Sequence, residues 1–175
     1  MSAFVAIDLS ASARLEVQTL IDAVRPRFEA KWLPPEKLHV TVQFLGNPEA
    51  ARIAGLLPLV DALAARHRPF ELGLRGAGTF ITARAPSVLW LGIDGALEAL
   101  QALHTDAATS LGALEVRDYR PHLTLARAHT DGFFEPLSEE LRDFTGTRFT
   151  VDGLTLYEST HHHYHVLHRA PFAPA

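Results

Sequence analysis

The sequence predicts a fold of mixed helices and strands in which the second half repeats the first. Three observations predict it. The chain has 175 residues, enough for one domain or for two small lobes that share one cleft. Segments with strand periodicity alternate with segments of helix periodicity. From Pro86 onward, the same order of segments begins again.

The first half has the order strand, helix, strand, helix, strand. Ser10 is the cap candidate of the first helix, which should end near Pro26, and Pro34 and Pro35 exclude a helix just before the second strand. The predicted segments are a strand over 3–9, a helix over 10–28, a strand over 38–46, a helix over about 48–65 and a strand over 70–76.

The second half has the same order, and Gly112 is the cap candidate of its first helix. The predicted segments are a strand over 87–94, a helix over 96–112, a strand over 120–128, a short helix over 136–144 and a strand-like stretch over 148–159. We therefore expect a single domain, 1–175, made of two repeated lobes at about 1–80 and 86–160, with a C-terminal strand over 163–172.

The two equivalent strands carry the same polar pair. His39 and Thr41 lie in HVTV, and His122 and Thr124 lie in HLTL, so each pair points from one face of its strand. Chance alone gives about 0.2 copies of such a motif in this chain. Polar outer faces of half-buried strands would explain the alternation but not the repeated identity. Two copies at equivalent places therefore indicate a site.

These residue types suit the cleavage of a phosphodiester without a metal. That reaction needs a base for the attacking water and an acid for the departing oxygen, and histidine serves both roles because its ordinary pKa is about 6.5. Each threonine projects about 6.6 Å further along the same strand face, where its hydroxyl can reach a phosphoryl oxygen. Such fixed donors stabilise negative charge in the transition state.

Several further stretches lie in an order that is similar to that of a known family. They are FVAIDLS, KWLPPEKLHVTVQFLGN, PFELGLRGAGTF, VLWLGI, RPHLTLAR, and LYES followed by Tyr164. With both motifs, they resemble the two-histidine phosphoesterase superfamily and, within it, the RNA 2′,3′-cyclic phosphodiesterases, also called 2′-5′ RNA ligases. The last loop departs from this family, because relatives usually have a Gly before the Tyr where this chain has THHHYH.

The resemblance implies an α+β fold of two lobes, each an antiparallel sheet backed by helices, that face each other across a central cleft. It implies hydrolysis of the terminal cyclic phosphate of RNA to a 2′-phosphate, and 2′-5′ ligation by the same groups. It further implies that His39 is the proton donor, that His122 is the proton acceptor, and that Thr41 and Thr124 bind phosphate. Because the two motifs are alike, the residues themselves leave the acid and base roles open.

Another substrate for the same centre and one different class of function stay open from the residues. The same centre would also suit small cyclic nucleotides or 2′-5′ oligoadenylates, and a chain that kept the cleft without turnover would be an RNA-end binding module. No cofactor is implied, because GAGTF (76–80) lacks the lysine and helix of a phosphate-binding loop.

Three residues are candidate substrate contacts. Phe44 either packs in the core or stacks on a base, and Tyr164 either packs or donates near the phosphate. Arg127 suits phosphate, but strict alternation puts it on the strand face opposite His122 unless the strand twists or ends there. Trp32 and Trp90 should be packing residues, and His67, His104 and His129 ordinary surface or helix-end residues.

The segment HHHYHVLH contains His161, His162, His163, His165 and His168. Composition alone suggests a metal site. His163 and His165 share a strand face that His168 does not, however, and no carboxylate or thiolate follows at ligand spacing. We therefore expect a loop beside the cleft and no metal.

Composition limits the remaining possibilities. The net charge of −4 gives no overall attraction to nucleic acid, so RNA would need a local basic cleft. The absence of cysteine excludes disulfides and thiolate chemistry. The N-terminus lacks a basic leader with a long apolar run, and no apolar stretch approaches the length of a membrane span. We expect a cytoplasmic monomer whose partner is RNA.

Overall fold

The computed structural model describes residues 1–112, 118–161 and 163–175. The helices are α1 (Ala11–Val24), η1 (Arg25–Arg27), η2 (Pro35–Lys37), α2 (Ala50–Ala65), α3 (Leu97–Leu111) and α4 (Glu135–Glu140). The strands are β1 (Ser2–Asp8), β2 (Lys31–Trp32), β3 (His39–Gly46), β4 (Phe70–Phe80), β5 (Ser87–Gly95), β6 (His122–Ala128), β7 (Phe149–Val151), β8 (Gly153–Ser159) and β9 (Tyr164–Pro171).

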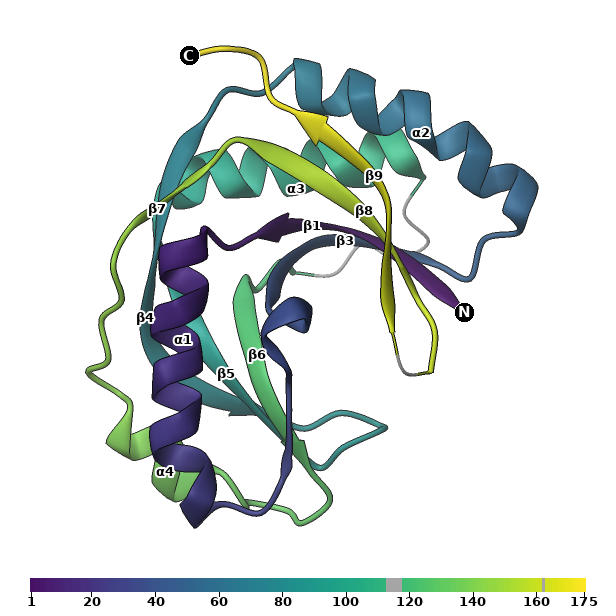
Figure 1. Ribbon diagram of the computed structural model, residues 1–175. Helices are drawn as coiled ribbons and strands as arrows, with labels where there is room; N and C mark the ends of the chain where they lie inside the picture. The colour runs from purple at the N-terminus through teal and green to yellow at the C-terminus, as the bar shows by residue number, and fades with distance from the viewer. Residues whose placement is uncertain (113–117, 162) are drawn as a thin grey trace.

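The strands form one curled sheet in the order β7-β4-β5-β6-β3-β1-β8-β9, with β2 paired to β6 (Figure 1). Every pairing is antiparallel, which confirms the predicted α+β class. The two halves of the sheet meet where β3 pairs with β6 through Val40 and Leu123. The sheet is therefore continuous across the junction, where the resemblance implied two separate sheets.

Each half of the sheet takes strands from both halves of the sequence. β4 pairs with β5 and β7, whereas β8 pairs with β1 and β9. The half that contains the first histidine motif is thus completed by β8, and the half that contains the second motif is completed by β4. The contiguous lobes at 1–80 and 86–160 do not describe this pairing, because strand partners are chosen by long-range packing that local periodicity does not encode.

The helices lie on the outer side of the curl (Figure 1). Ser10 caps α1 by accepting a hydrogen bond from Ala13 N at 3.1 Å, as predicted. The predicted helix over 10–28 ends at Val24, and Pro26 lies in the short η1 turn that follows. Gly112 ends α3 with a φ of 71°, a left-handed conformation that glycine adopts without a Cβ penalty.

The core lies between these helices and the sheet. The apolar faces of α1, α2 and α3 contribute Val17, Val60 and Leu103, each fully buried. Leu123 and Leu125 of β6 are also fully buried, on the side opposite the polar residues of the motif. This packing fixes the strands so that their polar residues face the inside of the curl. No helix of the described residues is long and apolar enough to cross a membrane.

Candidate active site

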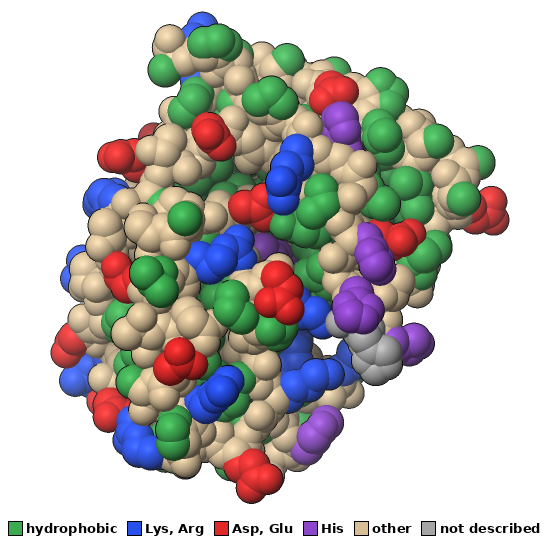
Figure 2. Space-filling view, viewed as in Figure 1, with side chains coloured by type: hydrophobic (Ala, Val, Ile, Leu, Met, Phe, Trp, Pro, Cys, Tyr) green, Lys and Arg blue, Asp and Glu red, His purple; other side chains and the backbone are tan. Residues whose placement is uncertain are grey.

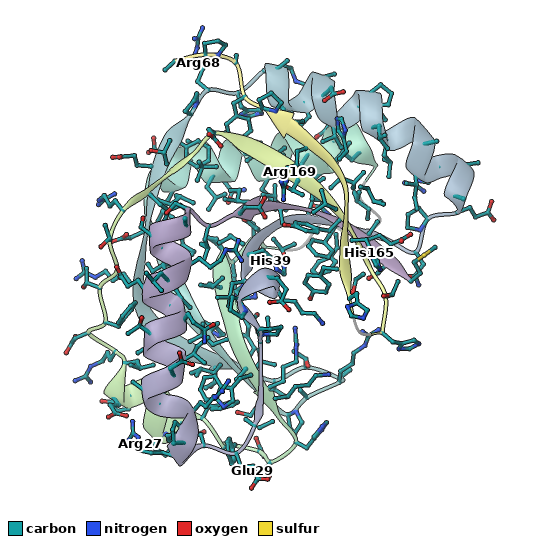
Figure 3. All side chains as sticks on the ribbon, in the orientation of Figure 1. Arg27, Glu29, His39, Arg68, His165 and Arg169 are labelled. Atoms are coloured by element: carbon teal, nitrogen blue, oxygen red, sulfur yellow. The ribbon has the colours of Figure 1, made fainter. Side chains whose placement is uncertain are left out.

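His39 begins β3 and is held in one tautomer by its neighbours. Its Nδ1 lies 2.7 Å from the carbonyl oxygen of Lys37, which can only accept, so Nδ1 carries the proton. Its Nε2 lies 3.1 Å from the hydroxyl of Thr41, which then donates to it. Figure 3 shows His39 on the inner side of the curled sheet.

His122 begins β6 and repeats this arrangement. Its Nδ1 lies 2.7 Å from the carbonyl oxygen of Arg120, again two residues earlier in the chain. The same tautomer follows, with the lone pair on Nε2. The two motifs therefore present the same imidazole atom for chemistry.

The pairing of Val40 with Leu123 brings the two motifs together. Because the strands are antiparallel, His39 and Thr124 lie toward one end of the junction, and Thr41 and His122 lie toward the other. The sheet thus places the four residues that the sequence predicts as the site around one point.

A β-bulge follows each motif at the same place. The pairing of β1 with β3 skips Val42, and the pairing of β5 with β6 skips Leu125. One extra residue reverses the alternation of the faces beyond it. Phe44 and Arg127, three residues after Thr41 and Thr124, therefore lie on the same face as the histidines.

The bulges settle the placement of both residues. Phe44 is 61% exposed, so its interpretation as a core residue is wrong. Arg127 is half-buried, and its charge lowers the pKa of both His39 and His122. Strict alternation misplaced Arg127 because a bulge leaves no signature in the apolar and polar pattern.

Aromatic rings surround His39. Phe4 stacks on its imidazole with ring centroids 4.9 Å apart, and Tyr157 and Tyr164 lie at 6.3 and 5.5 Å. Burial by these rings disfavours the imidazolium and lowers the pKa of His39 from 6.5 to about 4, although the carbonyl of Lys37 and the carboxylate of Asp8 oppose the change. His39 is therefore neutral at pH 7 in the free protein.

His122 lies in a more open setting. The ring of Phe80 meets it edge to face at 4.9 Å, and that of Trp90 lies at 6.4 Å. Burial also lowers the pKa of His122, with a smaller contribution from the charge of Arg127. Trp90 therefore packs as predicted, but at the wall of the site.

Tyr164 lies at the start of β9, beside the first motif. Its ring touches Phe4 edge to face at 5.4 Å, and the Nζ of Lys37 lies 5.0 Å from its centroid. Burial raises the pKa of its hydroxyl, which remains a donor at neutral pH. The packing role is thus present, and contact with a substrate stays a prediction.

A pocket of about 570 Å³ opens beside Thr41 and His122. Its lining residues come from both halves of the sheet, from α3 and from the segment before β6: Thr41, Val42, Gln43, Phe44, Gly46, Phe80, His104, Asp118, Tyr119, Arg120 and His122. Figure 2 shows several histidine and basic side chains gathered on the right of this face of the molecule. The charged lining residues are one arginine, Arg120, and one aspartate, Asp118, beside the two histidines.

The sequence did not single out Tyr119 and misjudged His104. His104 donates from Nδ1 to the carbonyl of Val42 at 2.7 Å, and the hydroxyl of Tyr119 donates to the carbonyl of Thr41 at 2.8 Å. Their rings stack at 4.1 Å. They satisfy the carbonyls of two consecutive residues at the bulge, so they hold the first motif in place. His104 is therefore a half-buried pocket residue on α3.

The remaining histidines and tryptophan lie away from the motifs. Trp32 packs against Phe134 and donates to the carbonyl of Phe28, as expected of a packing residue. His67 bonds Asp106 at 2.8 Å and is part of the contact between α2 and α3. His129 is exposed.

The histidine segment lies in and beside the β8–β9 hairpin. His162 lies outside the described residues. His168 bonds Asp61 at 2.6 Å, and the rings of His163 and His165 lie 6.1 Å apart. Figure 3 shows His165 on β9, to the right of His39. Within the described part of the chain, no three histidine or acidic side chains form a group that could hold a metal ion.

The fold and the paired motifs together define the class of two-histidine phosphoesterases. The family model of the 2′-5′ RNA ligase superfamily matches residues 12–163, and the chain belongs to this superfamily. This confirms the resemblance read from the sequence.

Two curated relatives and one solved structure illustrate the similarity. The RNA 2′,3′-cyclic phosphodiesterase of Geobacillus stearothermophilus is 32% identical over 161 residues, which cover 89% of this chain and 51% of that protein. The chain thus spans about half the length of that relative. The protein of the same name from Methanothermobacter thermautotrophicus is 32% identical over 128 residues, covering 71% and 70%. The crystal structure of TT0787 of Thermus thermophilus superposes with a TM-score of 0.77 at 25% identity, covering 99% of both chains.

Proposed function

We propose that this protein hydrolyses the 2′,3′-cyclic phosphate at the end of an RNA to a 2′-phosphate, with its two motif histidines as acid and base. The observation that carries the proposal is the meeting of two His–Thr pairs at the Val40–Leu123 junction. Each imidazole is held through Nδ1, which leaves Nε2 for proton transfer. The names of the curated relatives support the same reaction.

The reaction needs one proton to leave water and one to reach O3′. In the proposed roles, Nε2 of His122 takes the proton from water while the water oxygen attacks phosphorus. The P–O3′ bond breaks, and Nε2 of His39 gives its proton to O3′. The 2′-oxygen keeps the phosphate. The two histidines then exchange one proton with solvent to return to their starting states.

The burial of His39 bears on its role as the acid. A pKa of about 4 leaves its imidazole neutral at pH 7 in the free protein. The cyclic phosphate is anionic, and a negative charge against the ring favours the imidazolium. Substrate binding would therefore protonate the acid, and the acid would then be deprotonated by the chemical step.

The other residues of the site have supporting roles in this proposal. The hydroxyls of Thr41 and Thr124 donate to the non-bridging oxygens as charge builds on phosphorus. Arg127 offers a guanidinium to the phosphate or to its neighbour in the RNA, and the exposed ring of Phe44 offers a face for a base. With a 5′-hydroxyl in place of water, the same groups would form a 2′-5′ linkage.

The test is a short RNA with a 2′,3′-cyclic phosphate end, incubated with the protein in chelator. The expected product is the 2′-phosphate, formed at the same rate with and without chelator. His39→Ala and His122→Ala should each lose nearly all activity, at least about a hundredfold. His129→Ala is the matched control, because His129 is exposed and outside the site.

Three results would count against the proposal: a 3′-phosphate product, loss of activity in chelator, or activity that survives both single changes. Parallel assays with a 2′,3′-cyclic mononucleotide and a 2′-5′ oligoadenylate at equal concentration identify the preferred substrate. Binding of the cyclic-phosphate RNA without any product would show an RNA-end binding module instead.

A further inference from the structure

The two halves of the site differ at one position of the strands beside the motifs. In the first half, β1 places Asp8 opposite His39. In the second half, β5 places Gly92 opposite His122. The two positions are equivalent in the repeat. One histidine therefore has a carboxylate on the neighbouring strand, and the other has a hydrogen atom there.

The second half has no room for an acidic residue at this position. A Cβ built on Gly92 would lie 2.4 Å from the carbonyl oxygen of Arg75, closer than two such atoms can approach. The obstacle is backbone, which cannot rotate away as a side chain can. The difference between the two halves is thus fixed by the fold.

The carboxylate of Asp8 is held by two hydroxyl groups. Thr155 donates to its Oδ2 at 2.7 Å, and the hydroxyl of Tyr157 donates to its Oδ1. Both carboxylate oxygens thus accept a hydrogen bond, which fixes the orientation of the group. Tyr157 in turn stacks on Phe4 at 5.3 Å, and Phe4 stacks on His39. The acid is thereby fixed in place relative to the imidazole.

Other charged and titratable groups face His39 from the elements packed around it. His122 and Arg127 come from β6, and both disfavour a proton on His39. Lys37 is its neighbour in η2, and the hydroxyls of Tyr157 and Tyr164 are neutral, since burial raises the pKa of each. Among the described residues that act on His39, Asp8 is the one negative charge.

Arg14 and Arg169 are the positive charges that act on Tyr157, the partner of Asp8. Arg169 also lines a small pocket of about 230 Å³ that Asp8 shares. Neither arginine is among the charges that act on His39, and the effect of Asp8 on this ring is toward the protonated form.

We propose that Asp8 is the positioning residue that makes the two histidines unequal, because its carboxylate stabilises the protonated form of His39 and thereby assigns to His39 the proton that the leaving oxygen receives. This inference rests on the proposed function. It gives a structural reason for the acid and base roles, which the two like motifs leave open.

The test compares Asp8→Asn with the wild-type protein on two substrates. One is RNA with an ordinary 2′,3′-cyclic phosphate. In the other, sulfur replaces the bridging 3′-oxygen. A thiol has a pKa of about 8.5, so a thiolate leaves without a proton from the enzyme. Loss of the carboxylate that favours protonated His39 should therefore slow the reaction of the first substrate and not that of the second.

Asp8→Asn should lower kcat on the oxygen substrate about tenfold at pH 7.5 and leave kcat on the sulfur substrate within about twofold of wild type. The rate falls with rising pH as the acid loses its proton. Since removal of the carboxylate lowers the pKa of His39, this alkaline limb should move to lower pH by about one unit. Asp8→Glu should restore part of the loss.

Two matched variants separate charge from packing. Asp152→Asn removes another carboxylate from the same small pocket and should leave both substrates and the pH profile unchanged. Tyr157→Phe keeps the charge of Asp8 but removes one hydrogen bond, so the alkaline limb should stay at or above its wild-type position.

An equal loss on both substrates, or an alkaline limb that does not move in Asp8→Asn, would overturn this inference while the proposed function stands. A wild-type protein without turnover of cyclic-phosphate RNA would overturn both. His39→Ala should likewise lose much less activity on the sulfur substrate than on the oxygen substrate. If His122→Ala shows this difference instead, the acid is His122, and the proposed role of Asp8 is refuted.

Discussion

Val40 pairs with Leu123 at the centre of the sheet, where the two repeated motifs meet. Both side chains are fully buried on the helix side, so the junction is fixed by the core and not by the polar residues beside it. The neighbours of this pair, two histidines and two threonines, face the opposite side. A buried apolar pair thus holds the four polar residues of the candidate site in place.

The burial of His39 makes the stability of the protein depend on pH. The unfolded imidazole takes up a proton below about pH 6.5, whereas the folded one does so only near pH 4. The contribution of His39 to the free energy of unfolding is therefore fully present above pH 6.5. It falls by up to about 3 kcal/mol as the pH falls toward 4. Denaturant unfolding at a series of pH values should show a shallower dependence for His39→Gln than for wild type. Parallel curves for the two proteins would contradict the prediction, and His129→Gln should follow wild type.

The threonine hydroxyls should contribute to the chemical step more than to binding. Thr41→Val and Thr124→Val should each lower kcat about a hundredfold, because each removes one donor to the charge that builds on phosphorus. KM should change much less. Thr41→Ser keeps the hydroxyl and should retain most of the activity. A rise in KM with kcat unchanged would show that the hydroxyls serve binding alone.

The charge of Arg127 acts on both histidines, and its removal should be measurable without any substrate. Arg127→Gln should raise the pKa of His39 and of His122, since a nearby positive charge disfavours the imidazolium. NMR titration of the imidazole resonances measures both. If Arg127 also binds phosphate, the affinity for RNA should fall and its dependence on log salt should become less steep by about 0.7. Arg142→Gln, on the exposed surface, is the control and should change neither quantity.

Tyr119 and His104 should act as supports of the first motif. Tyr119→Phe removes the donor to the carbonyl of Thr41 and should lower the free energy of unfolding by about 1–2 kcal/mol, with a several-fold loss of kcat. His104→Phe keeps the ring stack and removes the donor to Val42, and should have a similar effect. Unchanged stability in both variants would show that the bulge holds its shape without them. In the double variant, the losses of unfolding free energy should not add, because both residues support the same bulge.

Much of the fold was accessible from the sequence because its strands alternate cleanly and its helices have caps. Ser10 and Gly112 cap the predicted helices, and both histidine motifs lie on strands. The stretch over 148–159 reads as one strand but forms two, β7 and β8, which pair with different halves of the sheet. Such pairing depends on partners far apart in the chain, and no local pattern reports it.

The site was predicted less completely than the fold. The two His–Thr pairs could be found because they repeat, whereas Phe44 and Arg127 could be placed only once the bulges were known. A bulge adds one residue without changing the composition of a strand, so it is invisible to a count of apolar and polar positions. His104 escaped for another reason: its partner is a backbone carbonyl, which every residue has.

β8 comes from the second half of the sequence but completes the half of the sheet that contains the first histidine motif. The surroundings of His39 can therefore be complete only late in the synthesis of the chain. Both motif histidines precede β8 and β9 in the chain, so they leave the ribosome before Tyr157 and Tyr164, whose rings shield His39. In a nascent chain that already contains both motifs, His39 thus still lacks the two tyrosine rings that shield it in the folded protein. In the proposed function, catalysis with the completed site has to wait until β9 has been made and has paired with β8.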